Sequence, residues 1–282
     1  MGGNMRERLR AAGHEVIGLD HDPALSDVAN AAELAARLTP PRAVWFMVPP
    51  AVTEAAIEEV AAELSPGDLI VDGGNTRFTD DLPRAKRLNE RGIGYVDVGV
   101  SGGVWGRENG YALMVGGAKE HVQRLMPIFE ALKPPGEFGF AHAGPVGAGH
   151  YAKMVHNGIE YGLMHAYAEG YELLTRSELV TNVPAVIKSW REGTVIRSWL
   201  LDLLDRALDE DPELATLRGY AEDTGEGRWT VDEAIRLAVP MNVIASALFA
   251  RFTSRQDDSP AMKAVAALRS QFGGHRVHDA KA

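Results

Sequence analysis

One stretch of thirty residues constrains the fold more than any other part of the chain. Residues 147–176 contain no proline and are rich in Ala, Leu, Met and Glu, which predicts a single long helix. Five polar side chains recur along it at short helical intervals: Lys153, His156, Asn157, Glu160 and Tyr161. At ~100° per residue, this spacing places them on one face within a little over two turns. A polar stripe of this kind is usually a solvated face, so the surrounding residues must decide its role.

The surrounding residues make this face a candidate site. The same face continues with Met164, Tyr167 and Tyr171, and the other sides are mostly apolar, so we expect the helix to be buried nearly all round. Gly158 and Gly162 each weaken a helix by ~1 kcal/mol relative to Ala, which favours close packing of another backbone or a ligand there. A buried lysine and a buried glutamate need partners. A site that requires shifted pKa values is a natural explanation.

The composition excludes several classes of protein. The 282 residues are enough for two domains, and the hydrophobic fraction of 45% and charged fraction of 24% are ordinary for a globular protein. The net charge of −10 argues against a nucleic-acid binder. Without cysteine there are no disulfides and no thiolate metal sites, which fits a cytoplasmic location. We also predict no metal site of another kind. No secretory signal is visible, and the longest nearly apolar run, residues 237–250, is too short to span a membrane.

Strand and helix signals alternate through the first half of the chain. After a first helix closed by Gly13, strands are expected at residues 15–20, 43–50, 69–75, 95–103, 112–117 and 138–144, with helices between most of them. This alternation is typical of an α/β protein with a Rossmann-type, doubly wound parallel sheet. From Gly147 onward only helices are expected. We therefore predict two domains, residues 1–145 and residues 146–282, with the boundary near Pro145.

The long helix also carries a family resemblance. Its sequence KMVHNGIEYG, residues 153–162, resembles the signature of decarboxylating 6-phosphogluconate dehydrogenases, within the β-hydroxyacid dehydrogenase superfamily. The resemblance extends over nearly the whole chain, and the run VWG at residues 104–106 is similar to the short, bacterial, NAD-preferring type. It implies a dinucleotide-binding first domain and an all-helical second domain for substrate binding and oligomerisation.

The chain begins inside the expected nucleotide-binding fingerprint. Met1-Gly2-Gly3-Asn4 resembles the end of the family's GxGxxG turn, with Gly2 as its third glycine. The first strand of the sheet is absent from this chain, and we expect it to belong upstream of Met1. The resemblance assigns Gly2 and Gly3 to the cofactor, where helix amides cradle the pyrophosphate.

Cofactor choice is expected to depend on Asp20. An acid at the end of the strand at residues 15–20 can accept hydrogen bonds from both ribose hydroxyls and repel a 2′-phosphate, although it can also simply cap a turn. With the resemblance, NAD is the expected cofactor and NADP the alternative, because His21 could temper the repulsion. Val48, Pro49 and Pro50 follow a strand where such folds bring the chain against the cofactor.

Two glycine turns are candidate substrate sites. DGGN, residues 72–75, and VSGG, residues 100–103, both end predicted strands, where ligands bind in parallel sheets. Glycine lets the backbone approach a ligand closely, and an adjacent Asn or Ser can bond a carboxylate or hydroxyl. The resemblance assigns four residues of these turns to the substrate, one of them (Asn75) also near the cofactor: Asn75, Ser101, Gly102 and Gly103.

The phosphate of the substrate is expected to be bound near the end of the chain. Arg251 matches the family's phosphate-binding arginine, whereas Thr224 and Glu226 stand where long members carry a Lys and a Thr. The sequence LRSQFGGHRV matches the family's terminal motif, which reaches a neighbouring subunit's site, and so implies roles for Arg269 and His275. We therefore expect a homodimer or homotetramer, with a small phosphorylated sugar acid as the other partner.

The chemistry of the family explains these residue types. Hydride removal from C3 requires a base on its hydroxyl, and Lys153 can serve if burial lowers its pKa towards 7. The same lysine, once protonated, can stabilise the enolate formed on decarboxylation, so no metal is needed. Glu160 then protonates the product, while His156 and Asn157 orient the sugar acid and Tyr161 binds its phosphate.

Two other interpretations stay open. Another β-hydroxyacid dehydrogenase, such as a 3-hydroxyisobutyrate dehydrogenase, would share the fold, Lys153 and the glycine turns. Such relatives usually carry asparagine in place of His156 and lack Glu160, Tyr161 and the FGGH tail. A non-catalytic sugar-phosphate-binding protein is suggested only by the missing fingerprint glycines. Measuring NAD affinity and 6-phosphogluconate oxidation separates the three.

Overall fold

The computed structural model describes residues 1–278, with only the backbone of Phe272. The chain divides into two compact units, Met1–Gly158 (unit 1) and Ile159–Ala282 (unit 2). The division falls inside one long helix, α7 (Ala148–Arg176), whose bounds agree with the helix predicted at residues 147–176. The domain boundary predicted near Pro145 stays a prediction, and the two units are described separately.

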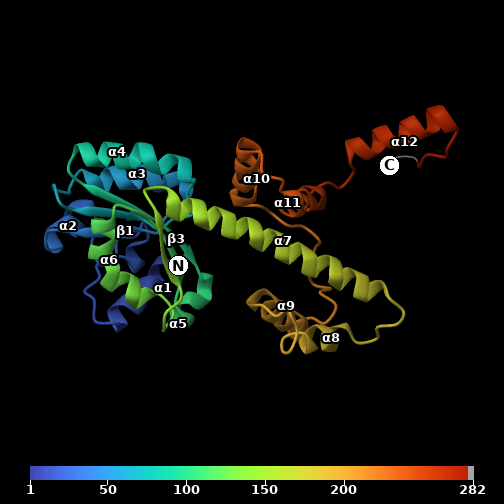
Figure 1. The fold of residues 1–282 in the computed structure, drawn as a ribbon, viewed down its shortest axis with the longest axis horizontal. Coiled ribbons are helices and arrows are strands. Elements are labelled where there is room, and N and C mark those ends of the chain that lie inside the picture. Colours follow the sequence, from blue (N-terminus) through green and yellow to red (C-terminus); the bar gives the residue numbers. More distant parts are fainter. Residues whose placement is uncertain (279–282) are drawn as a thin grey trace. The chain divides into compact units, whose positions relative to one another are not determined.

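Unit 1 is built on a five-stranded sheet (Figure 1). Its strands lie in the order β1-β2-β3-β4-β5, and they have these bounds: β1 (Ala43–Phe46), β2 (Leu69–Asp72), β3 (Gly94–Ser101), β4 (Ala112–Gly117) and β5 (Phe140–Gly144). All neighbouring pairs are parallel except β3 and β4, which are antiparallel. Parallel pairs need crossover connections, and the helices between the strands supply them. The predicted Rossmann-type, mostly parallel sheet is therefore confirmed, with one antiparallel pair that the sequence did not indicate.

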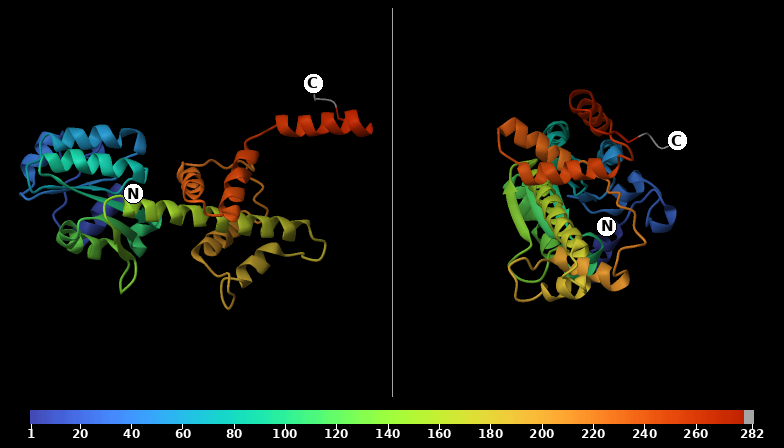
Figure 2. Two further views of the ribbon diagram at one scale, coloured as in Figure 1. Left: turned by 45° about the horizontal axis from the view of Figure 1, so that its top comes forward. Right: turned by 90° about the vertical axis from the view of Figure 1, so that its right-hand side faces the viewer.

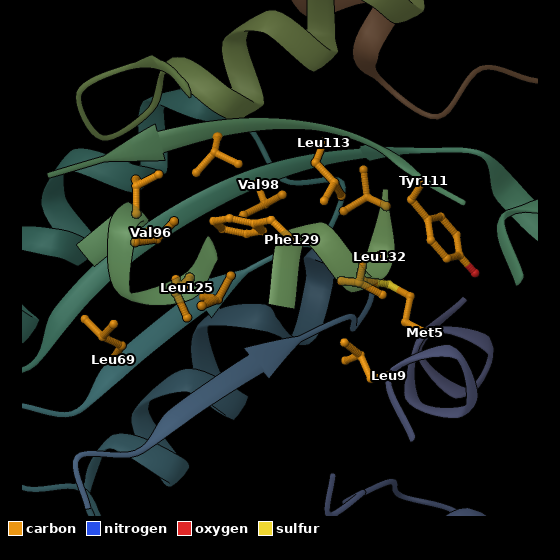
Figure 3. Close-up of a cluster of buried hydrophobic side chains, with 14 residues drawn as sticks. Met5, Leu9, Leu69, Val96, Val98, Tyr111, Leu113, Leu125, Phe129 and Leu132 are labelled. Atoms are coloured by element: carbon orange, nitrogen blue, oxygen red, sulfur yellow. The ribbon is translucent and has the colours of Figure 1, made fainter. Parts of the chain in front are cut away.

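Helices cover both faces of this sheet. They are α1 (Gly2–Ala11), α2 (Ala31–Arg37), α3 (Pro50–Ala61), α4 (Asp81–Glu90), α5 (Gly106–Asn109) and α6 (Lys119–Leu132), with short 3₁₀ turns η1 (Pro23–Leu25), η2 (Phe78–Asp80) and η3 (Gly103–Trp105). On one face α1 and α6 pack against the sheet, and Figure 3 shows Phe129 and Leu125 of α6 against Val98 of β3. On the other face α2, α3 and α4 bury a second cluster, which includes Tyr95 of β3. Because side chains alternate along a strand, β3 supplies both cores.

The strand predicted at residues 15–20 is wrong. These residues are not assigned to the sheet, whose edge strand in the described chain is β1. A strand exists only where a neighbour supplies ladder hydrogen bonds, and no strand of the described chain lies beside this segment. Its backbone is instead bonded to side chains: Asp27 accepts from the Gly18 amide at 2.7 Å, and Arg10 donates to the Val16 carbonyl at 3.0 Å.

Unit 2 consists of helices. Besides its part of α7, it contains α8 (Val183–Ser189), α9 (Trp199–Glu210), α10 (Glu226–Leu237), α11 (Asn242–Ser254) and α12 (Pro260–Gly273), and its described residues include no strand (Figure 2). Two small clusters of buried side chains hold it together, one around Leu248 and one around Leu201. No helix in the described part of the chain is long and apolar enough to cross a membrane.

The helix α7 is less buried than its sequence predicted. In the single chain Ile159 is 52% exposed, Leu163 is 43% exposed and Leu173 is 73% exposed. The expectation of burial nearly all round is therefore not met within one chain. The physical reason is size, because the two small clusters of unit 2 cannot cover every apolar side of a helix of 29 residues.

Candidate active site

Two glycines fix the position of Lys153 against the sheet. A Cβ on Gly99 of β3 would overlap the Cβ of Lys153, and a Cβ on Gly149 of α7 would lie 2.5 Å from the Met114 carbonyl oxygen. Neither glycine can carry a side chain without moving backbone atoms, so the first turns of α7 lie directly on β3 and β4. The start of the helix is also capped, because Asp97 of β3 accepts from the Gly147 amide at 2.7 Å. Lys153 is thus held by backbone packing.

Lys153 is part of a chain of polar contacts within unit 1. Its Nζ donates to Oδ1 of Asn157 and lies 3.5 Å from Nδ1 of His156. Nδ1 of His156 is 3.0 Å from the same Asn157 oxygen, so it carries the proton and Nε2 is the acceptor. Ser101 at the end of β3 can then donate to Nε2 at 3.5 Å. The structure therefore brings together four of the predicted site residues.

The turn after Ser101 exposes backbone to a ligand. Gly102 has φ +136° and Gly103 has φ +54°, and both values favour glycine. A Cβ on Gly102 would lie 3.2 Å from both the Gly110 carbonyl oxygen and the Tyr111 ring, whereas the corresponding position at Gly103 is open. The two predicted glycines thus serve different purposes: Gly102 allows a tight turn, and Gly103 leaves the backbone accessible.

The turn that carries Asn75 lies beside the end of β1. The Gly73 amide donates to the Phe46 carbonyl at 2.9 Å, and a Cβ on Gly74 would lie 3.2 Å from the Val48 carbonyl oxygen. Asn75 is half-buried. Since β1, β2 and β3 are mutually parallel, their carboxyl ends share one edge of the sheet, where ligands bind in such folds. The predicted residues Val48, Asn75 and Ser101 follow or end these three strands.

The start of α1 fits the pyrophosphate of a dinucleotide. The helix begins at Gly2, no side chain caps it, and the space around a Cβ on Gly3 is open. Free amides at a helix N-terminus bind anions, and glycine lets them approach closely. Pro49 and Pro50 open α3, where the missing amide of proline leaves no donor unsatisfied. These residues can hold the cofactor as the sequence predicts, and their roles stay predictions.

Asp20 lies in an irregular segment. Its Oδ1 accepts from the Asp22 amide at 3.0 Å and is 2.9 Å from Nδ1 of His21. The side chain of Asp20 is 41% exposed and that of His21 is 98% exposed. The turn-capping role is therefore present in the structure, and the carboxylate also remains accessible to a ribose. The prediction of an acid at a strand end is corrected here to an acid in a turn.

In unit 2, Tyr161 and Arg251 lie together. The guanidinium carbon of Arg251 is 3.5 Å from the centre of the Tyr161 ring, and Nη1 donates to the Glu222 carbonyl at 2.8 Å. Gly227 lies against the same ring, since a Cβ there would be 2.6 Å from it. Stacking on an aromatic ring holds a guanidinium in one plane, which suits recognition of an anion. Glu160, the residue before Tyr161, is half-buried.

A cluster of charged residues around the start of α10 was missed by the sequence interpretation: Asp223 precedes this helix, Arg228 lies in it, and Arg255 follows α11. Arg228 donates to Asp223 from Nε at 2.6 Å and from Nη2 at 3.0 Å, and Arg255 donates to the same carboxylate at 2.9 Å. The hydrogen bond from Arg228, followed by that from Arg255, lowers the pKa of Asp223 to about 2 in spite of its burial. Thr224 donates to the buried Glu226 at 2.6 Å. The only signal for this cluster was the charge-rich run around TGEGRWT.

The tail is exposed. Arg269 lies in α12 and His275 follows it, and both are exposed. Gly274 ends the helix with φ +63°, as is common after a helix. The Phe272 ring of the predicted terminal motif lies outside the described side chains. The roles predicted for Arg269 and His275 in a neighbouring subunit stay predictions.

A Rossmann-type sheet with ligand-accessible turns at one edge, followed by a helix that carries a half-buried lysine, is typical of a dinucleotide-dependent dehydrogenase. A model of the NAD binding domain of 6-phosphogluconate dehydrogenase matches residues 1–134, and a model of the 6-phosphogluconate dehydrogenase C-terminal domain matches residues 149–281. The chain belongs to the 6-phosphogluconate dehydrogenase family.

Individual relatives agree with this assignment. The putative 6-phosphogluconate dehydrogenase of Bacillus subtilis is 39% identical, and the match covers 98% of this chain and 95% of that protein. The NAD(+)-dependent, decarboxylating 6-phosphogluconate dehydrogenase of Haloferax volcanii is 38% identical with the same coverage. The solved structure of Plasmodium falciparum 6-phosphogluconate dehydrogenase has a TM-score of 0.81 and 27% identity, covering 97% of this chain and 63% of that one. The chain thus resembles the short relatives over nearly their full length and spans about three fifths of the Plasmodium protein.

A second group of structures shares only the fold. Mycobacterium tuberculosis 3-hydroxyisobutyrate dehydrogenase has a TM-score of 0.70 and 22% identity, covering 95% of this chain and 96% of that one. At this identity the likeness concerns architecture alone.

Proposed function

We propose that the protein catalyses the oxidative decarboxylation of 6-phosphogluconate to ribulose 5-phosphate and CO2, with NAD as the preferred cofactor. The observation that carries the proposal is the position of Lys153, held against β3 beside His156, Asn157 and Ser101. The relatives support it, since the Haloferax protein is NAD(+)-dependent and decarboxylating. The Plasmodium protein was solved in complex with NADP+ and with 6-phosphogluconate, so NADP stays an alternative cofactor.

Lys153 takes the proton from the C3 hydroxyl in the proposed first step. NAD, when bound, accepts the hydride that leaves C3. Asn157 holds the lysine nitrogen through the contact described above, His156 donates to the same Asn157 oxygen, and the Ser101 turn and Asn75 orient the sugar acid. Removing the hydroxyl proton as the hydride leaves produces a 3-keto acid, and positioned general bases contribute about 10²–10⁴-fold to such a step.

Decarboxylation follows without further oxidation. The bond to the carboxyl carbon breaks, CO2 leaves, and the electron pair moves onto the C3 oxygen. Lys153, now protonated, stabilises that oxygen and returns its proton to it. In the proposed last step Glu160 delivers a proton to C1 of the enediol, which gives ribulose 5-phosphate. Tyr161 and Arg251 bind the phosphate, for which their stacked arrangement in unit 2 is suitable.

The phosphate site differs from that of the long family members. Thr224 and Glu226 stand where those proteins are expected to carry Lys and Thr, and Glu226 is buried with its carboxylate bonded to Thr224. A buried carboxylate does not attract a phosphate, so we assign the positive charge of this site to Arg251, completed by Arg269 and His275 of another subunit.

We further propose that the protein is a homodimer or homotetramer with shared sites. The exposed apolar residues of α7 and an apolar row on α12, formed by Met262, Val265 and Leu268, support a subunit interface. These three residues are separated by three positions each, so they share one side of the helix. The cytoplasmic location remains a prediction from the sequence.

A substitution of the proposed base tests the function. Lys153→Met should lower kcat for 6-phosphogluconate oxidation by at least ~10²-fold, while NAD binding measured by calorimetry stays unchanged. Lys188→Met is the matched control, because Lys188 is an exposed lysine of α8 paired with Asp209. Near-normal turnover by the Lys153→Met protein would refute the proposed chemistry.

Mixing two inactive variants tests the shared site. One carries Lys153→Met, and the other carries Arg269→Ala and His275→Ala. If the tail completes a neighbour's site, mixed oligomers contain sites with an intact lysine and an intact tail, and activity partly returns. If subunit exchange is demonstrated and no activity returns, each site is built within one chain.

A substrate comparison separates the proposed function from the alternative dehydrogenase. Assays with 6-phosphogluconate and with 3-hydroxyisobutyrate should show a preference for the phosphorylated substrate, and Arg251→Met should remove most of it. An enzyme that oxidises 3-hydroxyisobutyrate better, or that binds the sugar phosphate without turnover, belongs to one of the other two interpretations.

A further inference from the structure

A buried cluster of charged side chains lies beneath the start of α7 and is not used in the proposed chemistry. It contains Asp72 at the end of β2, Asp81 and Arg84 of α4, and His150 in the first turn of α7. Asp72 and Asp81 are 0% exposed, and Arg84 and His150 are each 3% exposed. Charged groups this deeply buried are destabilising unless they are paired and hydrogen-bonded.

The cluster is closely paired. Nδ1 of His150 lies 2.9 Å from Oδ2 of Asp81, and Nη1 of Arg84 donates to Oδ2 of Asp72 at 2.9 Å. Tyr95 of β3 donates to Asp81 at 2.8 Å and accepts from Arg84 at 3.0 Å. The two carboxylates therefore face one guanidinium and one imidazole, and the charges of Asp72, Asp81, Arg84 and His150 balance only when His150 is protonated. Arg84 also pairs with the exposed Glu54 at 3.1 Å.

Electrostatics favour the protonated form of His150. Burial alone would lower its pKa, but the hydrogen bond and the negative charge of Asp81, with smaller contributions from Asp72 and Asp97, raise the pKa to about 9. The raised pKa favours the imidazolium form, paired with Asp81, whose own pKa is raised by burial against the opposing hydrogen bond and charge of His150. The Nε2 atom of His150 is buried and has no hydrogen-bond partner in the described chain. The hydrogen bonds that orient the imidazole ring are therefore those made by Nδ1.

Arg84 argues against a metal ion in this cluster. Oxygen and nitrogen atoms of Asp72, Asp81 and His150 lie close enough together to bind one. However, Nη1 of Arg84 is within 2.9 Å of Asp72 and 3.5 Å of Asp81, so a guanidinium already supplies the positive charge between the carboxylates. A divalent cation there would be repelled by it.

The cluster connects two elements of the proposed site. Asp72 and Thr76 flank the turn that carries Asn75, and Thr76 donates to Asp72 at 3.1 Å and lies 3.3 Å from Nδ1 of His150. His150 precedes Lys153 by three residues, which is nearly one helical turn. The same carboxylate of Asp72 accepts from the Gly74 amide at 2.9 Å. One network thus holds both the substrate turn and the helix of the base.

We propose that the His150–Asp81 ion pair is a positioning device that holds the turn carrying Asn75 in register with Lys153 of α7. The proposal rests on the proposed function, in which Asn75 and Lys153 face the substrate. Because Asp81 is 0% exposed and His150 is 3% exposed, the pair acts through its neighbours and not by contact with the substrate. A displacement of about 1 Å between reacting groups can lower a rate ~10²-fold, so the loss of the pair should slow hydride transfer in particular.

The first experiment measures chemistry per folded site. His150→Gln should lower the single-turnover hydride-transfer rate roughly 10- to 100-fold per NAD-binding site. It should also raise the isotope effect with substrate deuterated at C3, because the chemical step becomes slower than the others. Asp81→Asn should have a similar effect, and the double variant should be little worse than either, because the two residues act as one unit.

The control is a buried ion pair remote from these residues in the sequence. Asp205 of α9 is 2% exposed and pairs with Arg191 at 2.7 Å. Asp205→Asn should lower thermal stability without changing the isotope effect. If His150→Gln behaves like Asp205→Asn, the network is only structural and the proposal is overturned. If His150→Gln fails to fold, Thr76→Val is tested in its place. An increased isotope effect in Thr76→Val supports the proposal, and an unchanged isotope effect overturns it.

A second readout does not depend on activity. Hydrogen exchange should show faster exchange of the Gly74 amide in His150→Gln than in the unsubstituted protein or in Asp205→Asn. If the unsubstituted protein is inactive but His150→Gln still speeds exchange of the Gly74 amide, the proposed function is refuted. The coupling between the His150–Asp81 pair and the turn carrying Asn75 is then supported. An active protein in which neither exchange nor isotope effect responds would refute the coupling alone.

Discussion

The two ends of α7 have opposite surroundings. At its start, Gly149 leaves no room for a methyl group, and the amides of Gly147 and His150 are both bonded to Asp97. Towards its end, a Cβ added at Gly170 would meet nothing within 4 Å, and Leu173 is largely exposed. One helix is therefore packed against the sheet where it carries Lys153, whereas near its end, in the first part of unit 2, it is packed on one side by the Leu201 cluster and exposed on another.

The difference separates two requirements of an enzyme. Chemistry needs a base whose position is fixed to a fraction of an ångström, and backbone packing with capped amides provides this. Association needs an accessible apolar surface, and the far part of α7 offers one. The following predictions test this contrast, from the largest expected effect to the smallest.

Gly149→Ala should be strongly destabilising. Its methyl group would lie 2.5 Å from the Met114 carbonyl oxygen and 2.7 Å from that of Asp97, and these backbone atoms cannot move independently of the sheet. Overpacking of this kind costs about 3 kcal/mol or more, to be measured by urea unfolding. A stable, fully active Gly149→Ala protein would show that the start of α7 is not held as described.

Stability should depend on pH through His150. Its pKa is raised from 6.5 to about 9 in the folded protein, so its contribution is complete below about pH 6.5 and is lost as the pH rises through about 9. The loss amounts to roughly 3 kcal/mol, at ~1.4 kcal/mol per pKa unit. Urea unfolding at pH 6.5, 8 and 9.5 measures it, and His150→Gln should flatten the dependence. Equal slopes for both proteins would contradict the buried imidazolium.

Cofactor preference should respond to an exposed position of unit 1. Asp20→Asn removes the negative charge that would repel a 2′-phosphate, and we expect the NADP/NAD efficiency ratio to rise about tenfold, or ~1.4 kcal/mol. Asp22→Asn, which changes a nearby acid that caps the η1 turn, is the control. An unchanged ratio would mean that Asp20 acts only as the turn cap seen in the structure.

Gly170→Ala should have the smallest effect and the opposite sign to Gly149→Ala. A methyl group at Gly170 meets nothing within 4 Å, and alanine is the better helix former by about 1 kcal/mol. Thermal unfolding should therefore show a small gain in stability with unchanged activity. A marked loss would reveal a partner packed against this part of α7, and concentration-dependent unfolding would then identify it as a second copy.

Much of the fold could be predicted from local patterns. All five observed strands and the bounds of α7 agree with the predictions within a few residues, because alternation and helical composition are local properties. Residues 15–20 have the composition of a strand but no neighbouring strand in the described chain. Whether a segment pairs depends on its neighbours, which its own sequence does not specify. The antiparallel pairing of β3 and β4 likewise depends on the path of the chain between them.

The candidate site was predicted only in part. Lys153, His156 and Asn157 share a helical period, so their proximity follows from the sequence, and Ser101 was indicated by its glycine turn. The Asp72–Asp81–His150 cluster was not predicted, since its members are far apart along the chain and none belongs to a repeating pattern. The contact of Gly99 with Lys153 was also missed, because a glycine does not reveal what packs against it.

The carboxylate of Asp97 has a consequence for the order in which the protein is made. It is synthesised 50 residues before the Gly147 amide and 53 residues before the His150 amide that it binds. All five strands precede these amides in the sequence, so the carboxylate can be buried with its hydrogen bonds satisfied only once the start of α7 has been made. A chain that ends before residue 147 therefore lacks both the amides that satisfy Asp97 and the proposed base Lys153.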